Sequence, residues 1–151
     1  MTQEFNIVRY IELLKEDQEL RSQGSSFYYE GDKAKRSELL SYGIMVENQI
    51  IYNRRNEYIP LIEKYVSKKI ELFSFIFEFC TIRRKDLNLL DHLENNFEEL
   101  SKVLIDSKSN EFGDRIQAIF ETFEFVDDDI SESKFRSFME ESFLQIEQIF
   151  K

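Results

Sequence analysis

The sequence predicts an all-α protein, an antiparallel helical bundle of five or six helices. Apolar residues recur at spacings of three and four along most of the chain, which is the period of one helix face. The 151 residues include only 4 Gly and 1 Pro, too few for the many tight reversals of a β-sandwich or barrel. An apolar fraction of 42% with 15 Phe supplies a self-sufficient core.

We expect residues 58–151 to form an acidic helical bundle with a four-helix core. Residues 1–57 should pack on it as an N-terminal helical extension, within one compact domain overall.

Two helices are expected before residue 58. Residues 4–21 form the first, and the loop composition of residues 22–26 ends it. Residues 33–53 form the second, although Gly43 in its middle costs about 1 kcal/mol of helix stability. The expected apolar stripes are Ile7, Tyr10, Ile11 and Leu14 in the first helix, and Leu39, Tyr42, Val46 and Ile50 in the second.

Pro60 marks the expected start of a short third helix. In a first helical turn the missing N–H of proline removes no hydrogen bond. The buried face of this helix is predicted to be Ile62, Tyr65 and Val66.

The phenylalanine-rich segment 70–82 fits both a strand and a helix. Phe73, Phe75, Phe77 and Phe79 alternate as in a strand, while Phe73, Ile76, Phe77 and Cys80 have helical spacing. We favour a helix, because the segment is long for one strand and nothing else in the chain offers it a strand partner. Arg83, Arg84 and Lys85 are expected to end this helix, where its dipole favours cations.

Three further helical patterns follow. Leu90, Leu93, Phe97, Leu100 and Leu104 give the most regular spacing in the chain and predict one helix. Residues 112–123 repeat the pattern, and Ser131 or Ser133 is expected to cap a final helix. The predicted core is Ile11, Leu14, Val46, Phe73, Phe77, Leu93, Phe97, Leu100, Ile116, Ile119, Phe123, Phe135 and Ile146.

Charge is divided unevenly along the chain. Residues 86–151 hold 17 Asp and Glu against 6 Lys and Arg, and so account for nearly all of the net charge of −10. Such a surface favours a basic protein partner and repels nucleic acid and membrane headgroups, neither of which we expect to bind. The alternative is an acidic face that only keeps the protein soluble. The candidate partner-binding residues are Glu94, Glu98, Asp127, Asp128, Asp129 and Glu132.

No residue constellation predicts catalysis, a cofactor or a metal. His92 is the only histidine, and no nucleophile motif accompanies it. Cys80 lies in an apolar run and is expected to be an inert core thiol. Residues 129–140 partly match a calcium-loop template, but Lys134 stands where the sharp turn needs glycine. We therefore expect no enzyme. A single cysteine fits a reducing compartment such as the cytoplasm.

From residue 58 onward the chain resembles the colicin D immunity protein family. The resemblance rests on three segments: Tyr58-Ile59-Pro60-Leu61-Ile62, Lys69-Ile70-Glu71-Leu72-Phe73 leading to Arg83-Arg84, and Ile130-Ser131-Glu132-Ser133-Lys134-Phe135-Arg136. It implies a small acidic helical bundle that blocks a basic tRNA-cleaving toxin domain by presenting carboxylates where the toxin expects phosphates. It supplies no site residues.

Two functions follow as hypotheses. The first is an acidic immunity-type inhibitor that binds and blocks a basic nuclease. The second is a non-catalytic structural or assembly subunit, which would dock through its N-terminal helix and the loop Phe27-Tyr28-Tyr29.

Overall fold

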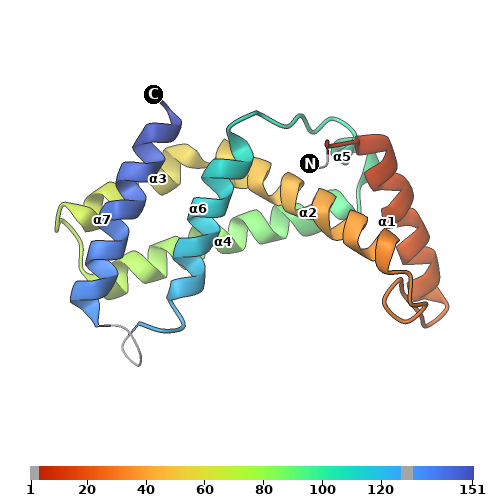
Figure 1. Cartoon of the computed structure of the whole chain (residues 1–151), viewed down its shortest axis with the longest axis horizontal. Coiled ribbons are helices and arrows are strands. Elements are labelled where there is room, and N and C mark those ends of the chain that lie inside the picture. The colour runs from red at the N-terminus through yellow and green to blue at the C-terminus, as the bar shows by residue number, and fades with distance from the viewer. Residues whose placement is uncertain (1–3, 127–130) are drawn as a thin grey trace.

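The computed structural model describes residues 4–126 and 131–151, and these are folded as helices joined by short connections (Figure 1). The prediction of an all-α bundle is confirmed, with seven helices in the described residues where five or six were expected. The helices are α1 (Ile7–Ser22), α2 (Lys33–Asn53), α3 (Arg55–Val66), α4 (Leu72–Glu94), α5 (Phe97–Leu100), α6 (Ser109–Thr122) and α7 (Glu132–Ile149).

The long helices α2 and α4 run between the two ends of the molecule. Figure 1 shows α1 and α5 at one end and α3 and α7 at the other. One core joins α3, α6 and α7 to parts of α2 and α4, and a second core joins α1 and α5 to the same two helices. In α2, for example, Ile51 belongs to the first core and Val46 to the second. Residues 1–57 thus share side-chain packing with the rest of the chain, and their division from residues 58–151 remains a prediction.

Side-chain caps fix several helix starts. The expected helix 33–53 is confirmed, and the Asp32 side chain accepts a hydrogen bond from the Lys35 backbone at 3.1 Å. Ser131 caps α7 by accepting from the Lys134 backbone, so the part of the calcium-loop match that the structure describes, residues 131–140, is a capped helix. These starts were predictable because capping is a local interaction.

Two expected helix boundaries are wrong. Instead of ending at Arg83–Lys85, α4 continues to Glu94, because the Arg83 side chain is buried against other helices. The regular stripe 90–104 is divided, since the Asn96 side chain caps a separate short helix, α5, and a connection without regular secondary structure follows α5. Leu104 is therefore 84% exposed.

The start of α3 also differs from the expectation. This helix begins at Arg55, so Pro60 lies inside it and not in its first turn. Arg54 ends α2 and precedes α3 directly, and its guanidinium binds Asp86 of α4. This contact holds the tight joint between the helices, which moves the start of α3 upstream of the proline.

The predicted buried face of α4 is wrong. Phe73 and Phe77 are 70% and 73% exposed, whereas Phe75 and Phe79 are fully buried. Phe75 stacks on Tyr65 of α3 at 4.7 Å between ring centroids, and Phe79 meets Phe123 at 5.2 Å. Both faces of α4 have helical apolar spacing, so the neighbouring aromatic rings decide which one is buried.

The rest of the predicted core lies in or against the two cores. Leu14, Val46, Leu93, Leu100, Ile116, Ile119, Phe135 and Ile146 are buried, and Ile11, Phe97 and Phe123 are half-buried against them.

Candidate functional site

Of the six candidate acidic residues, the structure describes three and places Glu132 apart from Glu94 and Glu98. Glu94 ends α4 and Glu98 is exposed on the adjacent α5. Glu132 begins α7, near the other end of α4 in Figure 1, and lies 3.7 Å from Arg136. Since α4 has 23 residues, its length of about 35 Å separates the two ends. Asp127, Asp128 and Asp129 lie outside the described residues.

Glu94 lines a groove between α1, α2 and α4 with a volume of about 500 Å³. Apolar side chains form much of its wall. Leu40 and Ile44 lie one turn apart on α2, both about half exposed, and Leu90 faces them from α4. The full lining is Tyr10, Leu14, Asp17, Gln18, Arg21, Leu39, Leu40, Gly43, Ile44, Glu47, Leu90, Glu94 and Asn95.

Three acidic residues, Asp17, Glu47 and Glu94, line this groove together with one basic residue, Arg21, and we call it the acidic groove. The Glu94 carboxylate accepts a hydrogen bond from the Tyr10 hydroxyl at 3.2 Å. Burial raises the pKa of Glu94, and the negative charges of Asp91 and Glu47 raise it further, while the hydrogen bond from Tyr10 opposes them. The charged groups that act on Glu94 are therefore acidic, and a bound cation would stabilise its ionised form.

Polar contacts hold α1 in place along the acidic groove. The Gln18 side chain donates to the backbone carbonyl of Glu94 at 3.1 Å, which fastens α1 to the end of α4. The Asp17 side chain accepts from the Phe27 backbone at 3.1 Å and pairs with Arg21 at 2.7 Å. The groove is thus built on hydrogen-bonded helices, a rigid setting for a binding site.

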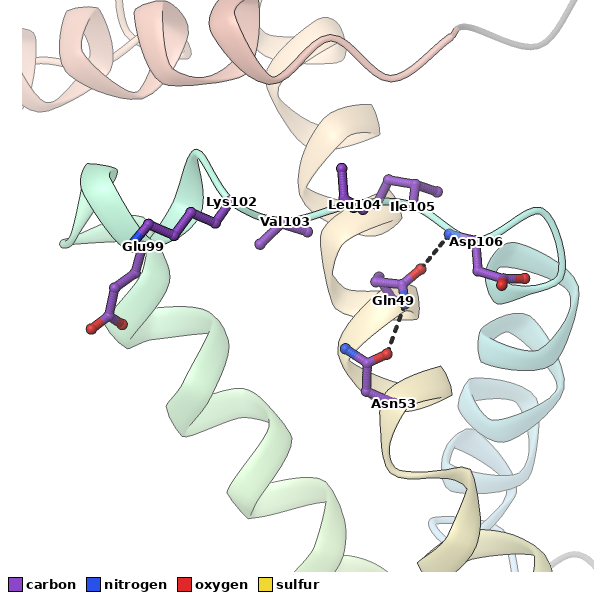
Figure 2. A pocket seen from close by; sticks show the side chains of 8 residues that line it. All are labelled: Gln49, Asn53, Glu99, Lys102, Val103, Leu104, Ile105 and Asp106. Carbon is purple, nitrogen blue, oxygen red and sulfur yellow. Dashed lines mark hydrogen bonds between the residues drawn. The ribbon is translucent and has the colours of Figure 1, made fainter.

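A second pocket, of about 620 Å³, lies under the segment 102–106 that leads from α5 to α6 (Figure 2). Gln49 of α2 accepts a hydrogen bond from the Asp106 backbone at 2.6 Å and donates to Asn53 at 2.8 Å. These dashed contacts in Figure 2 fasten the crossing segment to α2. The Gln49 amide is therefore engaged with the fold on both its oxygen and its nitrogen.

His92 and Cys80, the two residues considered for catalysis, lie in different surroundings. The exposed His92 ring lies 2.7 Å from Glu99, on the surface. Cys80 is half-buried, and burial raises the pKa of its thiol, which disfavours the reactive thiolate. Within residues 4–126 and 131–151, no three His, Cys, Asp or Glu side chains are grouped to hold a metal ion.

A buried ion network was missed from the sequence. Asp86, fully buried, accepts hydrogen bonds from Arg54 and from the Tyr58 hydroxyl, and Arg83 lies 3.7 Å from it. Arg83 also donates to Glu47 of α2 at 2.7 Å. Burial raises the pKa of Asp86, although its three partners oppose this effect. The sequence did contain a signal for this network, because Arg83 and Asp86 have the helical spacing that places them on the same buried face of α4 as Phe75, Phe79 and Ile82.

No helix in the described part of the chain is long and apolar enough to cross a membrane. Comparisons with protein-family models, with curated proteins and with solved structures give no match. The resemblance to colicin D immunity proteins therefore stays an expectation from the sequence.

Proposed function

We propose that this chain is a non-catalytic binding protein of the immunity type, whose acidic groove receives a cationic segment of a partner protein. The observation that carries the proposal is Glu94, a partly desolvated carboxylate with acidic neighbours in a groove much of whose wall is apolar. The ionised form of such a carboxylate lowers the stability of the unbound protein. A cation from the partner offsets that loss.

The shape of the acidic groove favours an amphipathic helix as the bound segment. Leu40 and Ile44 form an apolar ridge, with Leu90 across the groove. Helices that bind in grooves use apolar anchors spaced by three or four residues. A Lys or Arg beside those anchors would reach Glu94, and this requirement selects a basic amphipathic helix.

A basic nuclease is the partner class that best fits the molecule as a whole. The net charge of −10 attracts a surface built to hold phosphates. The resemblance of residues 58–151 to immunity proteins supports the same class. In this proposal the chain acts as an inhibitor in a reducing cytoplasm and needs neither cofactor nor metal.

The second candidate, an assembly subunit, retains one supporting observation. Tyr28 and Tyr29 are exposed and pack on each other at 5.4 Å, while Phe27 is buried in the core with α1. Only the two tyrosines of that loop are available to a larger assembly.

Crosslinking from the acidic groove tests the proposal. A photo-crosslinking amino acid replaces Ile44, and the same substitution at Leu144, exposed on α7, is the control. We expect the first variant to capture one basic protein from the native host. When purified, that protein should be a nuclease whose activity the wild-type chain abolishes at equimolar concentration.

Equal capture from both positions, or capture of a protein without nuclease activity, would contradict an inhibitory function for the acidic groove.

A further inference from the structure

A second surface, distant from the acidic groove, carries the largest exposed aromatic side chains of α4. Phe73 and Phe77 lie one turn apart and are 70% and 73% exposed. A pair of projecting phenylalanines typically marks a protein contact when other apolar surface adjoins it. Phe77 and Leu90 are about 20 Å apart along α4, so this surface leaves the acidic groove open.

A groove that Phe77 itself lines lies between α3 and α4, one turn from Phe73, with a volume of about 340 Å³. Pro60 and Leu61 line it from α3, and Phe77, Thr81 and Ile82 line it from α4. A projecting ring and a groove on one face form a self-complementary pair. A two-fold axis would place the ring of each copy in the groove of the other.

Charge indicates which partner can approach this face. Residues 55–85 hold 7 Lys and Arg against 4 Asp and Glu, so the remainder of the chain carries all of the negative excess. The groove itself is lined by Lys64 with Glu57 and Glu78, so two copies with a net charge of −10 each meet only a small part of that charge at this face.

Individual charges beside the groove are also complementary. Lys64 of α3 and Glu78 of α4 line it and form no ion pair with any described residue, whereas Glu57 is paired with Arg54 and Lys85. A two-fold contact offers each Lys64 the Glu78 of the other copy.

We propose that a second copy of this chain docks on the α3–α4 face, forming a two-fold dimer in which Phe73 and Phe77 of each copy contact the groove of the other. The dimer presents two acidic grooves, one in each copy, and its formation does not depend on the cationic partner.

Sedimentation equilibrium of the purified chain over a wide concentration range tests this dimer. We expect a monomer–dimer equilibrium that tightens as salt increases, because salt screens the repulsion between acidic copies. Binding of a cationic partner would weaken with salt, so the two kinds of contact are distinguishable.

Variants locate the interface. Phe73→Ser with Phe77→Ser should weaken dimerisation by more than about tenfold, with the helical circular dichroism unchanged, since both rings lie outside the core. Leu104→Ser, at a residue 84% exposed on the α5–α6 connection, should have no effect. Lys64→Glu should weaken the dimer, and adding Glu78→Lys should restore it.

A wild-type chain that stays monomeric at high concentration overturns the proposal. So does a dimer that is indifferent to the Phe73 and Phe77 substitutions. A monomer that binds vesicles of anionic phospholipid through these two residues would assign the face to a lipid surface and equally overturn it.

Discussion

Glu94 lowers the stability of the free fold while it serves the proposed function. Its pKa is raised above the ordinary value of 4.5, first by burial and then by Asp91 and Glu47. The folded chain therefore holds a proton at a pH where the unfolded chain has lost it. The free energy of unfolding must fall as pH rises from about 4.5 through the raised pKa.

Replacing Glu94 with Gln should remove this component of the pH dependence. Gln keeps an oxygen that can accept the Tyr10 hydrogen bond but carries no charge. Near neutral pH the variant should be more stable than the wild type, and below about pH 4 the two should agree. Urea unfolding at several pH values measures the difference. A variant that is less stable than the wild type at neutral pH would show that Glu94 is a structural carboxylate.

Asp86 shares the raised pKa of Glu94 but differs in its partners, because Arg54 and Tyr58 donate to it and the buried guanidinium of Arg83 lies beside it. Asp86→Asn leaves the buried guanidinium of Arg83 with Glu47 as its remaining carboxylate partner. Breaking a buried ion pair in this way costs about 3–5 kcal/mol. The control Glu57→Gln removes an exposed partner of Arg54 and should cost less than about 1 kcal/mol. Similar losses for both variants in denaturant unfolding would show that the network is no stronger than a surface pair.

At the scale of helices, the contact between α2 and α6 depends on Gly113. A Cβ atom added there would lie 2.2 Å from the Asn48 side-chain oxygen. Asn48 is buried and donates to Asp114 at 3.1 Å, so it cannot move without losing hydrogen bonds. The two helices therefore approach as closely as they do because residue 113 has no side chain.

A pair of glycine substitutions tests this contact. Gly113→Ala should destabilise the fold by about 1–3 kcal/mol, the usual cost of overpacking. Gly43→Ala should be neutral or stabilising by up to about 1 kcal/mol, because its Cβ meets only the Tyr10 hydroxyl at 3.5 Å and alanine favours the helix. Thermal unfolding of both variants gives the comparison. A Gly113→Ala variant as stable as the wild type would mean that α2 and α6 can move apart without loss of stability.

Local signals in the sequence predicted some elements well. The bounds of α2 and the Ser131 cap of α7 follow from side chains within a few residues of each other. The buried face of α4 was not predictable in this way, since Phe73 and Phe75 both lie on helical apolar stripes. The rings of Tyr65 and Phe123, from other helices, select Phe75 and Phe79.

The acidic groove was beyond sequence reasoning for the same reason. Its lining comes from α1, α2 and the distant α4, and of its residues the sequence indicated only Glu94 as a candidate for partner binding. Acidic composition indicated the charge of a partner but not the place where it binds.

At the scale of the whole molecule, α4 connects two surfaces of different character. One end carries the α3–α4 face with the exposed Phe73 and Phe77, and the other contributes Leu90 and Glu94 to the acidic groove. The net charge should steer a cationic partner toward the chain. Association should therefore slow several-fold when salt shortens the Debye length well below about 8 Å. Dissociation should change less, which stopped-flow binding can measure.

Nuclear magnetic resonance titration with a synthetic peptide tests the central claim most directly. The probe is an amphipathic helix with leucines on one face and lysines beside them, added to the isotope-labelled chain at low salt. We predict that shifts concentrate on residues lining the acidic groove, such as Leu40, Ile44 and Glu94, and that Glu94→Gln weakens binding several-fold. Shifts spread evenly over the acidic surface, or equal binding by Glu94→Gln, would contradict the assignment of this groove as the partner site.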